Sequence, residues 1–251
     1  MKISLSICII CKNEEDRIGA CLDSVQGLSD DVVVVDSGST DTTTDIARAA
    51  GARVFHNPWS GYGPQKRFSE DMARHSWILN LDADEVLSPA IAREIRTLLE
   101  KPPQFVAYRL KIMTIYPDKT APRLWADYNN YVRLYDRRQV RFRESPVHDT
   151  VDTGLHKVGQ LQGQVLHFSA RSYAHIRQKL AAYTDLQART LRKSRLYIAL
   201  RLPFEYPATF FRYYIMRRHV TGGWDGILSS HLAAEARFGR LLKMWAYKAS
   251  A

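Results

Sequence analysis

The first hundred residues alternate between short apolar runs and segments whose apolar residues recur at helical spacing. The predicted strands are 3–11, 32–35, 53–55 and 77–81, and the predicted helices are 14–28, 42–50, 65–74 and 89–100. Strands that are apolar throughout are typical of a parallel sheet covered by helices on both faces. The order strand, helix, strand, helix therefore predicts an α/β fold with a mainly parallel sheet.

The pattern changes after about residue 105. Strand-like segments separated by turns follow at 105–112, 131–135, 139–142 and 157–167. The rest of the chain has mainly helical spacing, and we expect Pro203 and Pro207 to break its helices. The sequence thus predicts one α/β domain at 1–170 and a mainly helical C-terminal extension at 171–251.

Charge separates the same two parts of the chain. Residues 171–251 hold 15 Lys and Arg against 4 Asp and Glu, whereas residues 1–170 hold 21 against 22. This surplus indicates a polyanionic partner, which can be nucleic acid, anionic lipid or a phosphorylated substrate. Residues 209–218 mix aromatic side chains with arginines, a mixture that suits an anionic membrane surface as well as nucleic acid. Packing of the aromatic side chains on the core is the alternative.

The three cysteines do not suggest a disulfide framework or a metal site. Cys8 and Cys11 lie three residues apart in one apolar run, so their side chains point to opposite faces of a strand. With Cys21, they are predicted to be small buried hydrophobes in a reducing compartment. We recognise no signal peptide and no apolar run of the ~18 residues that a membrane span needs.

Acidic residues follow three of the predicted strands. The first strand is followed by Lys12 and Glu14, the second by Asp36, and the fourth by Asp82 and Asp84. In an open α/β sheet, ligands bind at the carboxyl ends of the strands. Two neighbouring carboxylates are unfavourable unless a cation joins them, and their oxygens suit Mg²⁺ or Mn²⁺ with a diphosphate. We therefore expect a metal and diphosphate site here, with a solvated helix-capping turn as the alternative.

These segments together resemble family 2 of the glycosyltransferases, which have a GT-A fold, a Rossmann-like arrangement for nucleotide-diphospho-sugars. The resemblance is carried by residues 9–15 (IICKNEE), 34–43 (VVDSGSTDTT) and 79–85 (LNLDADE). More narrowly, the chain resembles bacterial lipopolysaccharide-core glucosyltransferases, which add β-linked glucose to an inner-core heptose. That resemblance rests on residues 61–67 (GYGPQKR), 131–135 (YVRLY), 146–149 (PVHD), 166–169 (LHFS) and 212–226.

The resemblance implies roles for individual residues on the donor side. Asp36 would contact the nucleobase, and Lys66 would lie near the base or the diphosphate. Asp82 would face the ribose and the metal, and Asp84 would bind the metal. The turn that frames the base would be formed by Ile10, Lys12 and Glu14.

On the acceptor side, the resemblance implies that Asp149 is the general base. It occupies, with His148, the place where relatives usually show His-Glu. His167 is a candidate metal ligand, and a partly buried, satisfied histidine is the alternative. Arg133 and Arg143 are expected to be solvated strand arginines, with contacts to acceptor phosphates as the alternative. The chain lacks the Q-x-x-R-W motif of processive relatives, which argues against polymer synthesis.

The resemblance implies inverting transfer of glucose from a UDP-sugar to a lipid-linked saccharide, such as the lipopolysaccharide inner core. We expect this at the cytoplasmic face of the bacterial inner membrane, with an anionic membrane surface as a partner and no nucleic acid. One alternative is a sugar nucleotidyltransferase, which would need a Gly-rich phosphate loop where this chain has residues 12–15. Another is a non-enzymatic protein that binds nucleic acid or a membrane surface.

Overall fold

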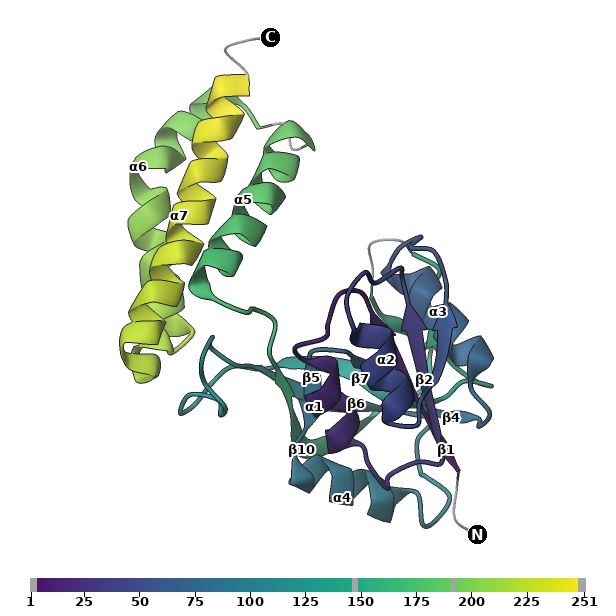
Figure 1. Cartoon of the computed structure of the whole chain (residues 1–251). Helices are drawn as coiled ribbons and strands as arrows, with labels where there is room; N and C mark the ends of the chain where they lie inside the picture. The colour runs from purple at the N-terminus through teal and green to yellow at the C-terminus, as the bar shows by residue number, and fades with distance from the viewer. Residues whose placement is uncertain (1–3, 146–148, 191–192, 248–251) are drawn as a thin grey trace. The chain divides into compact units, whose positions relative to one another are not determined.

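The computed structural model describes residues 4–145, 149–190 and 193–247. The chain divides into two compact units (Figure 1). The first, here the sheet unit, comprises residues 1–113 and 128–168. The second, here the helical unit, comprises residues 114–127 and 169–251. The segment 114–127 therefore interrupts the sheet unit in sequence and belongs to the helical unit.

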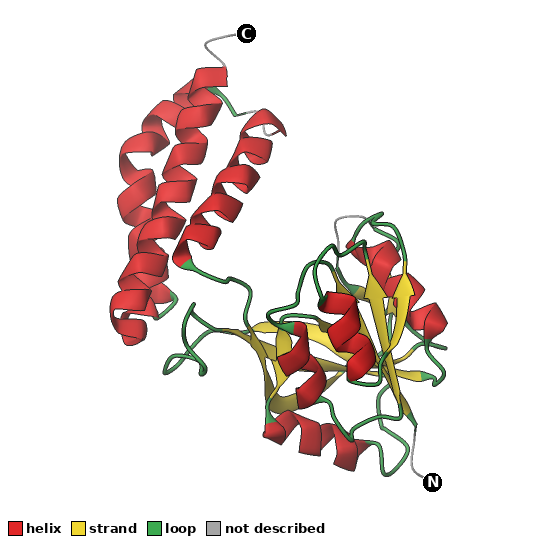
Figure 2. Ribbon diagram, viewed as in Figure 1, coloured by secondary structure: helices red, strands yellow, loops and turns green. Residues whose placement is uncertain are grey.

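The sheet unit is built on one eight-stranded sheet with the order β3-β2-β1-β4-β7-β6-β10-β5 (Figure 2). The strands of this sheet are β1 (Leu5–Cys11), β2 (Asp31–Asp36), β3 (Arg53–His56), β4 (Trp77–Asp82), β5 (Glu85–Leu87), β6 (Ala107–Thr114), β7 (Asn129–Asp136) and β10 (Gly159–His167). The pairs β2–β3, β1–β2 and β1–β4 are parallel, whereas β4–β7, β6–β7 and β10–β5 are antiparallel. The predicted α/β fold is confirmed, and the parallel part is the part built from the first hundred residues.

Two short strands were not predicted. One is β5, which follows the Asp82–Asp84 turn directly and pairs with β10. The other is β9 (Val151–Asp152), which forms a separate two-stranded sheet with β8 (Arg141–Phe142). Strands of two or three residues are too short to show a period of two, so the sequence pattern carries no signal for them.

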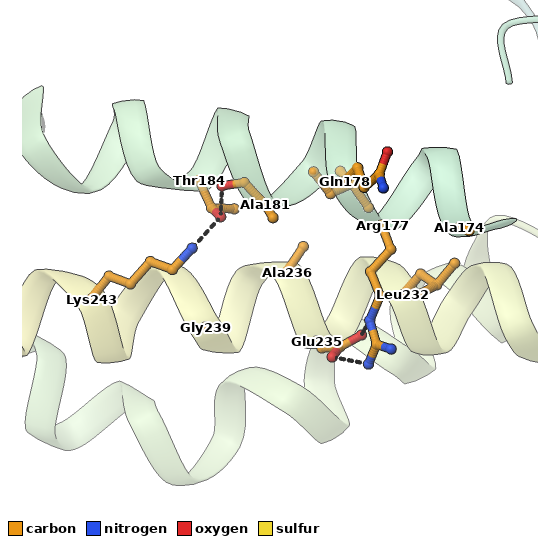
Figure 3. A pocket seen from close by; sticks show the side chains of 11 residues that line it. Ala174, Arg177, Gln178, Ala181, Thr184, Leu232, Glu235, Ala236, Gly239 and Lys243 are labelled. Atoms are coloured by element: carbon orange, nitrogen blue, oxygen red, sulfur yellow. Dashed lines mark hydrogen bonds and ion pairs between the residues drawn. The ribbon is translucent and has the colours of Figure 1, made fainter.

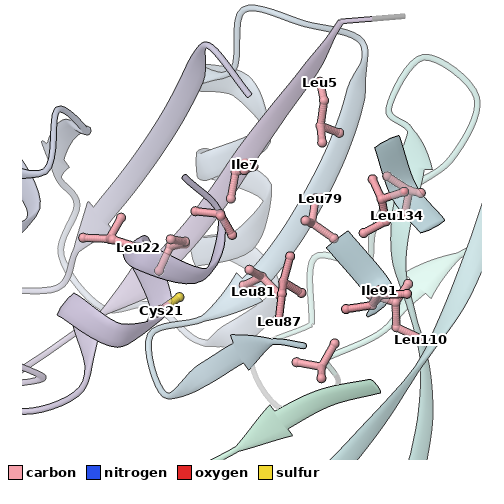
Figure 4. Close-up of a cluster of buried hydrophobic side chains, with 14 of the residues drawn as sticks. Leu5, Ile7, Cys21, Leu22, Leu79, Leu81, Leu87, Ile91, Leu110 and Leu134 are labelled. Carbon is pink, nitrogen blue, oxygen red and sulfur yellow. The ribbon is translucent and has the colours of Figure 1, made fainter. Parts of the chain in front are cut away.

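Four helices cover the sheet: α1 (Ile18–Ser24), α2 (Thr43–Ala49), α3 (Tyr62–Met72) and α4 (Pro89–Leu98). Successive residues of β1 enter different cores. Ile7 and Ile9 pack with α1 and α4 (Figure 4), whereas Cys8 and Ile10 pack on the side of α3. This alternation fits a strand that is buried on both faces, as predicted.

The cysteines are buried hydrophobes, as predicted. Cys8 and Cys11 belong to the two different cores, and neither they nor Cys21 form a disulfide. Burial in apolar surroundings raises the pKa of all three thiols far above the ordinary value. They therefore contribute packing and no thiolate chemistry.

In the helical unit, α7 (Gly223–Tyr247) lies between α5 (Tyr173–Thr190) and α6 (Arg195–Phe211) (Figure 1). The prediction that Pro203 and Pro207 break the helices was wrong, because both lie inside α6. Both prolines are exposed, so water can reach the carbonyl groups that lose a backbone partner. Among the described residues, no helix is long and apolar enough to cross a membrane.

Two short turns join α6 to α7 and hold the segment 114–127. They are a π-helical turn, Arg212–Met216, and a 3₁₀ turn, His219–Gly222. The Tyr116 hydroxyl lies 2.8 Å from His219 Nδ1, and the Thr221 hydroxyl donates to the Leu124 carbonyl at 2.6 Å. Burial, with the nearby Arg123, lowers the pKa of His219 to about 4, so this imidazole is neutral at pH 7.

Candidate active site

The predicted acidic strand ends lie at one edge of the sheet. In the parallel pairing of β1 with β2, Cys11 is opposite Asp36, and in its pairing with β4, Ile10 is opposite Asp82. Asp36 and Asp82 therefore end the two strands that flank β1. The structure brings them to the carboxyl edge, where the sequence predicts a ligand site.

The turn after β1 is held against the loop after β2 by side-chain bonds to backbone groups. Asn13 adopts a left-handed conformation with φ 55°, and its amide oxygen accepts from the Thr40 backbone N–H at 2.8 Å. The Glu14 backbone N–H donates to the Thr43 hydroxyl at 2.8 Å. Lys12 is exposed at the tip, and Ile10 is buried at the end of β1. The two loops thus form one ordered rim.

Asp36 organises the loop that follows it. Its carboxylate accepts from the Gly38 backbone N–H at 2.9 Å, and from the Ser39 backbone N–H at 3.0 Å and hydroxyl at 2.5 Å. Burial opposes ionisation, but these hydrogen bonds outweigh it and lower the pKa of Asp36 below its ordinary value. Asp36 does not cap α2. The N-cap residue of α2 is Thr42, and its side chain accepts no capping hydrogen bond from the helix backbone. The Cys11 thiol also donates to Asp36 Oδ1 at 3.7 Å, so a ligand N–H would share a carboxylate oxygen with one of these four donors.

The segment 61–67 connects both sides of the site through α3. Gln65 donates to the Ser37 hydroxyl at 2.9 Å, and Arg67 donates to the Phe142 carbonyl at 2.9 Å. Position 63 requires glycine because the chain at Arg143 passes close to it: a Cβ at Gly63 would lie 2.1 Å from the Arg143 carbonyl oxygen. The Gly and Gln positions of this motif therefore hold α3 against the loop after β2 and the chain that leads to Asp149.

Lys66 is fully buried and is shared by two carboxylates. Its ammonium donates to Asp149 Oδ2 at 2.8 Å and lies 2.8 Å from Asp82 Oδ1 in an ion pair. Asp149 Oδ1 is also buried and has no hydrogen-bond partner among the described residues. The structure thus brings the predicted base and the first Asp of the D-x-D motif together on one cation. His148, the neighbour of Asp149, lies outside the described residues.

Arg133 is the residue that sequence reasoning misjudged. It is 4% exposed, not solvated as expected, and its guanidinium contacts Asp82 Oδ2 at 2.9 Å and Glu85 Oε1 at 3.1 Å. On alternating positions of β7 it shares a face with Tyr135, which is fully buried. Its neighbour Leu134 on the other face is also buried, so alternation along β7 gave no signal for this burial. Arg143 is exposed as expected, and it pairs with Asp152.

Asp82 therefore has a cation on each side. Burial opposes its ionisation, but Lys66 and Arg133 outweigh burial and hold the pKa of Asp82 well below its usual range. Burial raises the pKa of Glu85 although Arg133 opposes the shift. The network keeps Asp82 charged at the edge of the sheet and leaves its two oxygens facing Lys66 and Arg133.

Asp84 and His167 form the second pair of the site. His167 Nε2 lies 3.3 Å from Asp84 Oδ2, and Arg17 lies 3.6 Å from the same oxygen. The pairing of β10 with β5 places His167 opposite Glu85, and the Phe168 backbone N–H donates to the Asp84 carbonyl at 2.9 Å. The unpredicted strand β5 is therefore the element that brings these two residues together.

The chemistry of this pair fits a divalent cation. A carboxylate and an imidazole are ligands that Mn²⁺ accepts, and such ions typically complete their coordination with water and diphosphate oxygens. Among the described residues, no three His, Cys, Asp or Glu side chains converge on one point. Asp84 and His167 would thus be the protein's contribution, because the Asp82 oxygens already face two cations.

A separate groove of about 560 Å³ lies between α5 and α7 in the helical unit (Figure 3). Ala181, Ala236 and Gly239 line it with other residues. Its charged side chains are paired, since Arg177 contacts Glu235, and Lys243 lies 2.8 Å from Asp185 Oδ1. The groove contains none of the predicted site residues, so the candidate active site remains at the edge of the sheet.

Comparison with known proteins agrees with the fold and the site. The sequence profile of Glycosyl transferase family 2 matches residues 6–155. A protein from Rickettsia bellii, described as an uncharacterized glycosyltransferase, is 36% identical over 96% of this chain and 85% of its own length. The lipopolysaccharide core biosynthesis glycosyltransferase LpsC of Rhizobium meliloti is 38% identical over 43% of this chain and 42% of its own.

Solved structures add support for the fold. The crystal structure of S. aureus TarS 1–349 matches 99% of this chain and 92% of its own, with a TM-score of 0.50 and 13% identity. The mixed sheet and its acidic carboxyl edge define a glycosyltransferase with a GT-A fold. Within that class, the chain belongs to glycosyl transferase family 2, as the sequence motifs predicted.

Proposed function

We propose that this protein is an inverting, divalent-metal-dependent transferase that moves glucose from a UDP-sugar to a lipid-linked saccharide, such as the lipopolysaccharide inner core. The proposed place of reaction is the inner surface of the bacterial cytoplasmic membrane. One observation carries the proposal: Lys66 joins Asp82 to Asp149, and Asp84, which pairs with His167, follows Asp82 by two residues. The identity to LpsC supports the acceptor class.

The donor side follows from the rim of the sheet edge. Asp36 offers an ionised, pre-oriented acceptor to a nucleobase N–H, framed by Ile10, Lys12 and Glu14. A divalent cation held by Asp84 and His167 would supply Lewis-acid stabilisation of the charge on the diphosphate. Lys66 is the buried ammonium nearest to Asp82 and is available to the same charge.

Asp149 acts as the base in this proposal. Its Oδ1, which has no hydrogen-bond partner among the described residues, takes the proton of the acceptor hydroxyl as the hydroxyl oxygen forms a bond to the anomeric carbon. The bond between the anomeric carbon and the diphosphate breaks on the opposite face, so the configuration inverts. The electron pair leaves on the nucleoside diphosphate, and the proton remains on Asp149.

Membership of family 2 favours a transferase over both alternatives from the sequence. A sugar nucleotidyltransferase would make a nucleotide-sugar, and a non-enzymatic binder would give the paired Lys66 and Asp149 no use. The basic helical unit is accordingly assigned to acceptor and membrane contact, without nucleic acid as a partner.

The test is isothermal titration of UDP into the full chain with and without Mn²⁺. We expect Mn²⁺-dependent binding that is weakened at least ~10-fold in Asp84→Ala, because a metal ligand is removed. Asp45→Ala is the matched control, since this exposed aspartate on α2 lies outside the site. Absence of UDP binding by the unmodified chain, with or without metal, would refute the donor assignment.

A further inference from the structure

The solvent-facing side of α6 is apolar. Leu196, Leu200, Phe204 and Phe211 are 70%, 67%, 68% and 58% exposed. Their spacing of four, four and seven residues places them on one side of a helix with 3.6 residues per turn. Pro203 and Pro207 fall on the same side and are also exposed. Helices at a protein surface normally turn this kind of face inward.

The opposite side of α6 already makes the contacts that hold it in the helical unit. Ile198, Glu205 and Thr209 are buried, and α6 packs on α7. Glu205 is the only acid of α6, and it pairs inward with Arg201 and Arg237. The apolar side is therefore not needed for packing within the described part of the unit, and it has no carboxylate.

Further exposed apolar side chains follow the end of α6 within the helical unit. Ile215 and Met216 in the π-helical turn are 45% and 69% exposed. Trp224 at the start of α7 is 76% exposed, and Leu124 and Trp125 are 65% and 67% exposed. The bond from Thr221 to the Leu124 carbonyl holds these last residues beside the 3₁₀ turn. We call the exposed apolar side chains at 124, 125, 196, 200, 204, 211, 215, 216 and 224 the apolar ridge.

Positive charge accompanies the apolar ridge. Arg212 and Arg218 are exposed, and neither has an acidic partner among the described residues. Residues 171–251 have 15 Lys and Arg against 4 Asp and Glu. A symmetric contact with a second copy would bring these like charges together, which disfavours self-association through the ridge. An anionic lipid bilayer, which has acyl chains beneath its phosphate groups, can bind both the apolar side chains and the arginines.

We propose that α6 docks in the plane of an anionic phospholipid bilayer through the apolar ridge. Leu200, Phe204 and Phe211 would enter the region between headgroups and acyl chains, and Arg212 and Arg218 would pair with lipid phosphates. Trp125 and Trp224 would lie at the headgroup level, where tryptophan is enriched. The inference deepens the membrane contact in the proposed function and rests on it for its biological purpose, but the docking itself requires no donor.

The test is sedimentation of the full chain with phosphatidylcholine vesicles, with and without about one third phosphatidylglycerol. We expect binding to the anionic vesicles that weakens at high salt. Leu200→Glu/Phe204→Glu should raise the lipid concentration for half-binding at least ~10-fold, since two exposed apolar chains no longer enter the interface. Leu155→Glu is the matched control, because Leu155 is fully exposed in the sheet unit.

Three results would overturn the proposal. One is equal binding by the unmodified chain and the double variant, and another is equal loss in the Leu155→Glu control. The third is a concentration-dependent dimer that the double variant converts to monomer while vesicle binding is unchanged, which would make the ridge a self-association surface. UDP titration of the unmodified chain separates the two proposals: UDP binding without vesicle binding refutes the docking alone, and the converse refutes the donor site alone.

Discussion

The two units differ in which side chains depart from the usual burial pattern. The sheet unit buries charge, since Lys66 is fully buried and Arg133 and Glu85 are 4% and 1% exposed. The helical unit instead exposes apolar side chains, because Phe204 and Leu200 on α6 are about two-thirds exposed, at 68% and 67%. Both arrangements run against ordinary burial rules.

The difference shows where each unit is incomplete. In the sheet unit, the buried cations Lys66 and Arg133 each have carboxylate partners, and Asp149 Oδ1, a buried oxygen without a hydrogen-bond partner among the described residues, is the one that the proposed reaction uses. In the helical unit, apolar surface has no partner within the described chain. A protein departs from local rules mainly at functional sites, so the comparison supports the two proposed sites, which differ in their chemistry.

The largest effect is expected at Asp149. Asp149→Asn should lower kcat by ~10²–10⁴ because the base is removed, while UDP still binds. Initial-rate kinetics with saturating donor measure this, and Asp152→Asn, an exposed neighbour paired with Arg143, is the control. Full turnover by Asp149→Asn would remove this residue from the mechanism.

Loss of a buried charge in the sheet unit should be costly for stability. Arg133→Met is expected to lower the free energy of unfolding by ~3–5 kcal/mol, because Glu85 and Asp82 lose a buried partner. Denaturant unfolding checks it against Arg143→Met, for which ~0.5 kcal/mol or less is expected at an exposed pair. Adding Glu85→Gln to Arg133→Met should restore part of the loss, and failure to do so would contradict the charge argument.

The helical unit has its own buried polar contact, at His219. Its folded pKa of about 4 lies below the ordinary 6.5, so between these values the unfolded chain binds a proton that the folded chain does not. Stability should therefore fall as pH decreases through this window, by on the order of 1 kcal/mol after allowance for solvent screening. In His219→Gln, the glutamine amide can replace part of the contact with Tyr116, but it does not titrate. The unfolding free energy of this variant should therefore depend less on pH between pH 7 and 4. An unchanged slope would assign the pH dependence elsewhere.

The smallest effect is expected on the apolar ridge. Phe204→Ser should change the free energy of unfolding by no more than ~0.5 kcal/mol, because the ring has little contact to lose. Ile198→Ala, on the packed side of the same helix, should cost ~2–5 kcal/mol. Thermal and denaturant unfolding of the two variants measure these changes. Equal losses of unfolding free energy would contradict the proposed contrast between the two sides of α6.

The sequence predicted the parallel half of the sheet well. Its strands are continuous apolar runs and its helices have clear spacing, so local pattern and tertiary burial agree. The common edge of Asp36 and Asp82 followed from parallel topology alone. Family membership followed from three motifs at the ends of three strands, and the profile match confirms it.

Other features depend on contacts between distant parts of the chain. β5 is three residues long, and its partner β10 lies far along the sequence. The local sequence pattern therefore could not predict the pairing of Asp84 with His167. Arg133 was expected in solvent because an arginine is rarely buried without partners, and its partners come from β4 and β5. The predicted helix break at the prolines of α6 was wrong for a similar reason, because local helix propensity takes no account of which side of the helix is packed.

The buried state of the cysteines has a practical consequence for measuring membrane depth. Cys8, Cys11 and Cys21 are buried and their thiols resist ionisation, so thiol-directed reagents should leave the unmodified chain unlabelled. A cysteine introduced in place of Leu200 would be the single reactive thiol without removal of the native ones. A spin label attached there would report immersion in the bilayer, and the same label at Leu155 would report water.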